Sequence, residues 1–247
     1  VDPVTAVVPA AEAGQLGVVS ATALASVFVR RLQDGDPDGA MRRSMARFPV
    51  PGVAATVLRR YFLPDGRPTG VPYKLVSMHR QGMPRAQHQL TMLAGFVEVD
   101  LAKEGHSAPV GVNLLTKLQL PNLPLLYGAM LAGVDVVLMG AGIPKEIPGV
   151  LDALAEHKAV SLRLDVEGAP AGMTEVISFD PLDQWPAETH LVALQRPQFL
   201  AIIASNSLAT MLARKASGRV DGFVVEGPTA GGHNAPPRGE MHLTSGG

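Results

Sequence analysis

The chain contains no cysteine among its 247 residues. This absence excludes disulfide bonds, thiolate nucleophiles and cysteine-bound metal or iron–sulfur centres. Charged residues are also scarce, at 17% of the chain, and the formal net charge is only -1. Without a long basic run, the sequence gives no indication of nucleic-acid binding.

Long apolar runs are missing as well. No stretch approaches the ~20 residues that a helix needs to cross a bilayer. The N-terminal residues lack the charged start and the apolar run of a signal peptide. We therefore expect a cytoplasmic protein with no membrane partner. Hydrophobic residues nevertheless make up 47% of the chain, which is enough for the core of a large α/β domain.

Several familiar catalytic motifs do not occur. The chain has no H-E-x-x-H and no P-loop. No G-x-S-x-G surrounds Ser20, which argues against a serine hydrolase. The stretch MGAGIP, Met139–Pro144, follows an apolar run but lacks the third glycine of the dinucleotide-binding fingerprint.

The chain does contain a repeated order of short apolar run, glycine-containing turn and helical stretch. The apolar runs are continuous rather than alternating, as expected for strands that are buried on both faces. Helical stretches between them predict right-handed βαβ crossovers and a parallel sheet. The five predicted strands span residues 16–21, 109–115, 134–142, 199–205 and 220–227.

Two segments interrupt this order. Residues 34–95 are rich in Pro, Arg and Gly, and we expect short helices there, in an excursion between the first two strands. Residues 159–190 are expected to form an added strand pair or an arm, which could mediate a homodimer. Residues 2–14 read as a helix despite Pro9.

Five βα units are fewer than the eight that a barrel of ~250 residues normally holds. The sequence therefore predicts one of two architectures. Either the sheet is open, or the chain is a fragment of a longer barrel.

The most unusual stretch is VDGFVVEGPTAGGHNAPPRG, Val220–Gly239. An apolar run reaches Glu226, and two glycines, Gly231 and Gly232, then precede His233. Ligands of parallel α/β sheets meet the loops at the carboxyl ends of the strands. The glycines would let backbone and ligand approach closely. An imidazole with an unperturbed pKa of ~6.5 could abstract a proton from a carbon acid.

The alternative to a functional site is an ordinary turn that carries a surface histidine.

Two more polar residues lie within or at the ends of predicted strands. Asn113 interrupts the apolar run VGVNLL. A buried amide needs hydrogen-bond partners, which a planar polar ligand or a neighbouring backbone could supply. Glu226 could accept hydrogen bonds from ligand hydroxyls, or it could be a solvated carboxylate at a strand end.

Four segments together resemble the nitronate monooxygenase family, formerly called 2-nitropropane dioxygenases. They occur in the family's order and read GQLGVVSATAL, PVGVNLL, LAGVDVVLMGAGIP and GRVDGFVVEGPTAGGH. The last is the most specific, because the family pattern there is G-x-E-A-G-G-H. Thr229 replaces the glutamate in this chain. The resemblance covers most of the chain apart from residues 34–95 and 159–190.

Members of this family are FMN-dependent TIM (β/α)8 barrels. The resemblance implies that residues 1–247 form a single flavin-binding barrel domain. It also implies that this domain is incomplete, because counterparts of the family's first strand and last two strands are lacking. Loops of those last strands hold the FMN phosphate in the family.

The resemblance also assigns roles to residues of this chain. His233 matches the family's catalytic histidine, which acts as a base on the substrate α-carbon. The other matches are contacts to the flavin, its ribityl chain or its immediate surroundings. These cofactor-binding positions are Asn113, Ser205, Glu226, Gly231 and Gly232.

The implied reaction is oxidation of an alkyl nitronate or nitroalkane by FMN, with O2 reoxidising the reduced flavin. The wording EGPTAGGHN, with Thr229 and Asn234, is closer to reductase-like members attached to polyketide and polyunsaturated fatty-acid synthases. Those use NAD(P)H to reduce enoyl thioesters, which gives an alternative substrate and reaction. A third interpretation is a non-catalytic barrel that binds a small molecule or a partner protein.

Overall fold

The computed structural model describes residues 3–164, 166–168, 170 and 172–227. Its helices are α1 (Pro3–Glu12), α2 (Leu24–Gln33), α3 (Ala40–Arg47), α4 (Val53–Tyr61), α5 (Arg85–Ala102), α6 (Gln119–Leu131), α7 (Ile147–Ala155), the short 3₁₀ helix η1 (Leu182–Gln184) and α8 (Asn206–Lys215). Its strands are β1 (Gly17–Ser20), β2 (Val110–Leu115), β3 (Val136–Gly140), β4 (Val160–Leu164), β5 (Glu175–Phe179), β6 (Gln198–Ile203) and β7 (Gly222–Val225).

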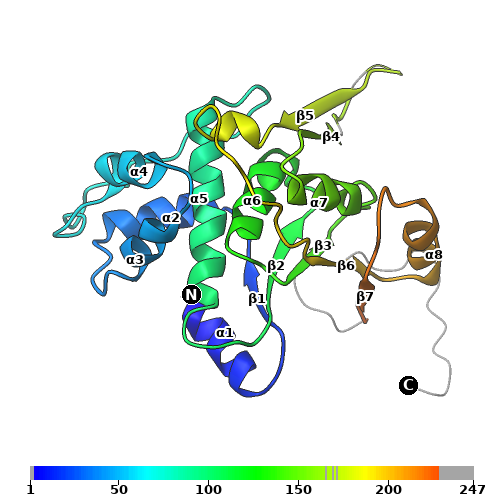
Figure 1. Ribbon diagram of the computed structural model, residues 1–247, viewed down its shortest axis with the longest axis horizontal. Helices are drawn as coiled ribbons and strands as arrows, with labels where there is room; N and C mark the ends of the chain where they lie inside the picture. The colour runs from blue at the N-terminus through cyan, green and yellow to red at the C-terminus, as the bar shows by residue number, and fades with distance from the viewer. Residues whose placement is uncertain (1–2, 165, 169, 171, 228–247) are drawn as a thin grey trace.

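Five strands form one parallel sheet in the order β1-β2-β3-β6-β7 (Figure 1). All five predicted strands are confirmed, and each predicted end lies within two residues of the observed one. The predicted N-terminal helix is also present, with Pro9 inside it. The fold is therefore α/β, with a parallel sheet flanked by helices.

The spatial order of the strands follows their order in the chain. A doubly wound sheet instead reverses its strand order at a switch point. With right-handed crossovers, steps in one direction place the connecting helices on one face of the sheet. In the part of the chain that the structure describes, the sheet remains open, with β1 and β7 as its edges.

The two faces of the sheet differ in burial. Successive residues of a strand point to opposite faces. Val112, Val137 and Phe199 are at most 1% exposed and belong to the hydrophobic core that includes the helices. Asn113 and Leu115, which alternate with them, are only half-buried. The helical layer thus covers one face, and the described residues cover the opposite face less completely.

Helices α5 and α6 pack side by side against this sheet (Figure 1). Gly128 of α6 lies directly on the backbone of α5, and a Cβ built there would collide with the carbonyl oxygen of Met92. Gly95 of α5 faces the backbone of α6 in the same way, with its ideal Cβ 2.7 Å from the carbonyl oxygen of Leu125. Both glycines are thus required by the close approach of the two backbones.

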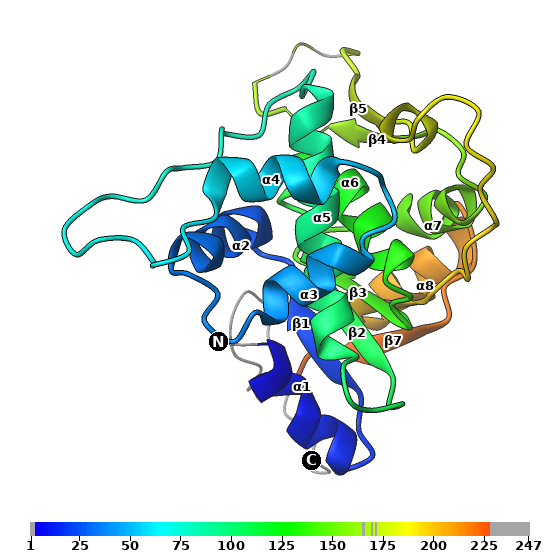
Figure 2. The same ribbon diagram turned by 60° about the vertical axis from the view of Figure 1, so that its left-hand side comes forward.

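The excursion after the first strand contains short helices, as expected, in α3 and α4. Helix α3 begins after Asp36, whose buried carboxylate accepts hydrogen bonds from the amides of Met41 and Arg42. The excursion ends before Arg85 rather than at residue 95, because α5 begins there and contributes to the core. Beyond α4 the chain runs out as an extended loop, visible at the left of Figure 2, before it returns to α5.

The second insertion contains the expected strand pair. Strands β4 and β5 are antiparallel and form a separate two-stranded sheet. The two insertions meet, because Gln81 Nε2 donates hydrogen bonds to Glu175 Oε2 (2.8 Å) and to the carbonyl oxygen of Val176 (3.2 Å).

A buried network fixes the chain that follows this strand pair. His157 Nε2 lies 2.8 Å from the carbonyl oxygen of Val192, so this nitrogen carries the proton and Nδ1 accepts from the Tyr127 hydroxyl at 2.8 Å. The same hydroxyl oxygen accepts from Trp185 Nε1 at 3.0 Å. Burial raises the pKa of Tyr127 to about 12, although the Trp185 hydrogen bond opposes this shift. The network joins α6, the turn after α7 and the connection to β6.

No helix within the described residues has both the length and the apolar character needed to cross a membrane.

Candidate functional site

Two pockets lie at the carboxyl edge of the sheet, one on each side of the loop between β2 and α6. The first, called here the β3 pocket, has a volume of about 720 Å³ and is formed chiefly by the loops after β2 and β3. The second, called here the β1 pocket, has a volume of about 550 Å³ and is formed chiefly by the loops after β1 and β2. Lys117 and Gln119 line both pockets, which are therefore neighbours across this loop.

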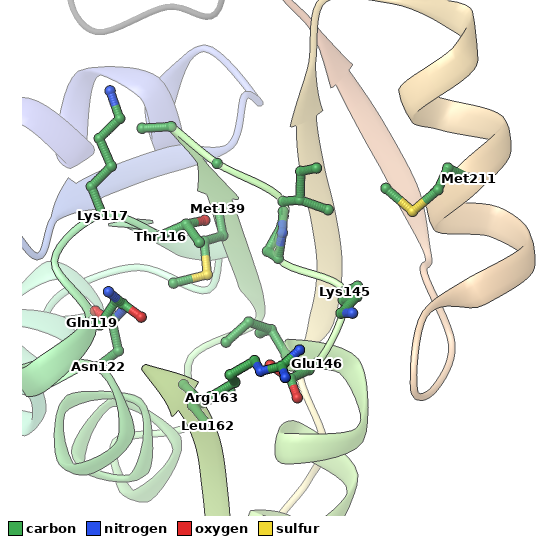
Figure 3. A pocket seen from close by; sticks show the side chains of 15 residues that line it. Thr116, Lys117, Gln119, Asn122, Met139, Lys145, Glu146, Leu162, Arg163 and Met211 are labelled. Carbon is green, nitrogen blue, oxygen red and sulfur yellow. The ribbon is translucent and has the colours of Figure 1, made fainter. Parts of the chain in front are cut away.

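The β3 pocket combines an apolar floor with cations at its rim. Figure 3 shows Thr116 and Met139 at its centre, with Met211 of α8 opposite and Arg163 of β4 below. The Thr116 Oγ1 atom is buried and has no hydrogen-bond partner among the described residues. Gly142 approaches Thr116 closely, since a Cβ at this glycine would lie 2.8 Å from Thr116 Cβ.

Three cations and one carboxylate line the β3 pocket, namely Lys117, Lys145, Arg163 and Glu146. Lys117 and Lys145 are exposed and form no ion pair with residues that the structure describes. Arg163 donates a hydrogen bond to Thr174 Oγ1 at 3.1 Å and likewise forms no ion pair within that set. With three cations against the single carboxylate of Glu146, the lining favours an anionic group over a cationic one.

The β1 pocket is more apolar. Its wall includes a segment of the excursion, residues 74–79, which we call the strap. Two buried glutamines hold the strap in place: Gln33 exchanges hydrogen bonds with the backbone of Lys74 at 3.1 and 2.7 Å, and Gln87 Nε2 donates to the carbonyl oxygen of Ser77 at 2.8 Å. This anchoring brings side chains from residue 76 onward against the end of β1.

His79 is the histidine of the strap. Its Nε2 lies 3.2 Å from Thr91 Oγ1, and that hydroxyl donates to the carbonyl oxygen of Gln87 at 2.9 Å. The hydroxyl therefore accepts from His79, and Nε2 of the neutral ring carries the proton. Burial lowers the pKa of His79. Burial also lowers the pKa of His88, and the nearby charge of His79 lowers it further, against an opposing effect of Asp183.

These shifts predict that the folded chain is destabilised by acid. An unfolded histidine has a pKa of ~6.5. Because both folded values are lower, the unfolded chain binds more protons, and the free energy of unfolding falls as the pH drops below ~6.5. Replacing His79 and His88 together by glutamine should flatten this decline, as measured by urea unfolding at a series of pH values. His190→Gln, at an exposed position, should leave the decline unchanged; an equally steep profile in the double variant would contradict the prediction.

Asn113 lies on the less covered face of the sheet, in register with Ser20 of β1 and Leu138 of β3. Its Oδ1 atom is buried and has no hydrogen-bond partner among the described residues. A buried acceptor left unpaired costs about 1–3 kcal/mol. The amide oxygen is thus an acceptor that a ligand N–H or O–H could use.

The other described site residues lie at the ends of β6 and β7. Ser205 is the N-cap of α8, and its Oγ accepts a hydrogen bond from the amide of Leu208 at 3.3 Å. This capping contact gives the serine a role in starting the helix. Glu226 follows β7 directly, and its amide donates to the carbonyl oxygen of Ile203 at 2.8 Å. Ser205 and Glu226 are therefore brought to the same corner of the sheet.

Asn113 is separated from this corner by two intervening strands. From β2 to β7 there are three strand spacings, or roughly 14 Å along the sheet. The remaining candidates, Gly231, Gly232 and His233, lie outside the described residues. The structure thus places Ser205 beside Glu226, and Asn113 apart from both.

Some site residues were not found from the sequence. Lys117 and Lys145 follow the ends of β2 and β3 closely, so a basic residue soon after a buried strand is a signal that could have identified them. His79 carried no such signal. It reaches the β1 pocket because the buried side chains of Gln33, 41 positions from Lys74, and of Gln87 fix the strap.

No family model, curated protein or solved structure matches the chain.

Proposed function

We propose that this protein is an FMN-dependent oxidoreductase that oxidises alkyl nitronates or nitroalkanes, with O2 as the electron acceptor. The observation that carries the proposal is the unpaired, buried amide oxygen of Asn113 on the less covered face of the sheet. Among the segments that resemble the nitronate monooxygenase family, PVGVNLL contains this asparagine. A flavin ring offers an N–H donor that would satisfy its oxygen.

The arrangement of the strands supports a barrel as the complete architecture. Neighbouring strands succeed one another in chain order, as in a (β/α)8 barrel, and the helical layer covers one face. In a barrel the opposite face lines the interior, and ligands bind at the carboxyl ends of the strands. Both pockets described above open at that end.

Each site residue has a role in this proposal. Asn113 would accept a hydrogen bond from the flavin, and Glu226 would accept hydrogen bonds from its ribityl hydroxyls. Ser205 would lie near the cofactor, and Gly231 and Gly232 would allow the backbone to pass close to it. Among the described residues, Asn113, Ser205 and Glu226 lie near the carboxyl ends of their strands, where a cofactor site in a parallel α/β fold is expected.

His233 holds and moves the proton. Its imidazole takes a proton from the α-carbon of a neutral nitroalkane, or donates a hydrogen bond to the nitronate anion. Bound FMN supplies the electron acceptance, and the protein positions substrate and cofactor and excludes side reactions.

A flavin titration tests the proposal. The protein should quench FMN fluorescence on binding, and Asn113→Leu should weaken the affinity about tenfold, because the hydrogen-bond acceptor is lost while the shape is kept. Under anaerobic conditions a nitronate alone should bleach the bound flavin. Absence of FMN binding, or bound flavin that no nitronate bleaches, would contradict the function proposed here.

A flavin enoyl reductase is the second candidate, and the β1 pocket favours it. This pocket of about 550 Å³ is larger than a small nitroalkane requires and has a mainly apolar wall. Rapid anaerobic bleaching by NADPH, followed by reoxidation with an enoyl thioester, would select the reductase. A protein that binds a small molecule or a partner without catalysis would show neither reaction.

A further inference from the structure

We propose that the β1 pocket and the rim of the β3 pocket together bind an amphipathic anion, with its hydrocarbon chain in the β1 pocket and its anionic head at Lys117. The inference names a substrate class for the site and rests on the proposed function for the reaction. The binding step itself can be measured without the flavin.

The chain-binding part is the wall of the β1 pocket. Apolar side chains from four separate segments converge there, and Leu24 and Leu125 are almost completely buried at its base. The apolar residues that carry the argument are Leu24, Ala25, Val76, Leu120, Leu125 and Leu164. Burying a hydrocarbon against such a wall is favourable by about 0.8 kcal/mol per methylene group, or roughly fourfold in affinity.

His79 and Thr91 do not require a charged ligand group inside the β1 pocket. Burial lowers the pKa of His79, which favours the neutral ring, and its Nε2–H donates a hydrogen bond to Thr91 Oγ1. Thr91 in turn uses its own proton on the carbonyl oxygen of Gln87. A bound hydrocarbon chain, which has no polar atoms, therefore leaves His79 and Thr91 with the hydrogen bonds that they already form.

The head-binding part is the wall that the two pockets share. Lys117 lines both pockets and stands at the edge of the β3 pocket in Figure 3. It forms no ion pair with described residues, and on the β3 side Lys145 and Arg163 add two cations against the one carboxylate of Glu146. An anionic head next to Lys117 would complement this charge, whereas a cationic head would be repelled.

The volume of the β1 pocket is large enough for a hydrocarbon chain. Ligand sites of about 300–1,000 Å³ typically hold drug-sized molecules, and the β1 pocket, at about 550 Å³, lies within this range. The adjoining β3 pocket adds room for a head larger than a carboxylate, such as a phosphate ester.

A chain-length series tests the inference on the flavin-free protein. Calorimetric titration with butanoate, octanoate and dodecanoate should show saturable binding that tightens at least tenfold from octanoate to dodecanoate, since each buried methylene contributes about fourfold. Dodecyltrimethylammonium, with the same chain and the opposite charge, should bind far more weakly. Equal affinity across the series, or equal binding of the cationic amphiphile, would overturn the inference.

Variants locate the site. Lys117→Gln should weaken dodecanoate binding roughly fivefold, whereas Lys215→Gln, an exposed lysine outside both pockets, should leave it unchanged. Ser26→Trp should fill the β1 pocket and remove the dependence on chain length. If Lys117→Gln and a folded Ser26→Trp protein both bind like the wild type, the ligand lies elsewhere and the proposal fails.

The outcomes also separate this inference from the oxidoreductase proposal. Chain-length-dependent binding without flavin reduction would retain the amphiphile site and reject the oxidoreductase. Flavin reduction by nitronates, together with ligand binding that does not depend on chain length, would retain the oxidoreductase proposal and reject the amphiphile site.

Discussion

Replacing Gly128 by alanine should lower the free energy of unfolding by about 3 kcal/mol. The new Cβ would collide with the carbonyl oxygen of Met92 and lie 2.7 Å from its carbonyl carbon. Backbone atoms of a helix cannot move aside independently, so α5 and α6 would have to separate. Urea unfolding followed by circular dichroism measures the loss.

The sign of the stability change in Gly128→Ala is informative, because helix propensity alone would make alanine stabilising. In an open helix position alanine is more favourable than glycine by about 1 kcal/mol. A stabilised Gly128→Ala protein would therefore show that the two helices are not in close contact at this point. A clear loss of stability would place the close approach at the glycine itself.

Two further variants separate a backbone collision from a general intolerance of alanine. Gly222→Ala brings its Cβ within 2.9 Å of Leu200 Cδ2, the flexible end of a side chain, and should cost less than about 1 kcal/mol. Shortening Met92 to alanine should not rescue Gly128→Ala, because the obstructing atom belongs to the main chain. Full rescue by Met92→Ala would contradict the proposed cause.

The strands were predictable because strands that are buried on both faces consist of continuous runs of apolar residues. A continuous apolar run such as residues 109–115 has one interpretation when helical stretches flank it. Helix α5 was harder to delimit. Its first residues, from Arg85 to Gln89, are mostly polar and follow a Pro- and Gly-rich loop, so they resembled the excursion. Their helical state is stabilised by the core contacts of the residues that follow.

The candidate site was predictable in part, for the same physical reason. Asn113 could be recognised as a polar residue inside an apolar run. In the structure its Oδ1 atom is buried and has no hydrogen-bond partner among the described residues. The strap gave no comparable signal. Its position against the β1 pocket depends on hydrogen bonds between residues such as Gln33 and Lys74, which lie 41 positions apart. Only the folded chain brings such segments together.

His233→Ala should reduce the anaerobic bleaching of bound flavin by a neutral nitroalkane about 10²–10⁴-fold, which is the usual contribution of a general base. The substrate must lose its α-proton before electrons can leave the carbon, and the variant has no imidazole to accept it. FMN affinity should remain close to that of the wild type, because the proposed cofactor contacts are other residues. Stopped-flow absorbance at the flavin band measures the rate.

Preformed nitronate provides the decisive comparison, because it has already lost the proton. If His233 acts as the base, the variant should lose much less of its rate with the nitronate than with the parent nitroalkane. An equal loss with both would assign the histidine to binding the anion rather than to proton transfer. His190→Ala, at an exposed histidine, should change neither rate. A wild-type rate for His233→Ala with the neutral substrate would remove His233 from the chemistry altogether, whatever binds the flavin.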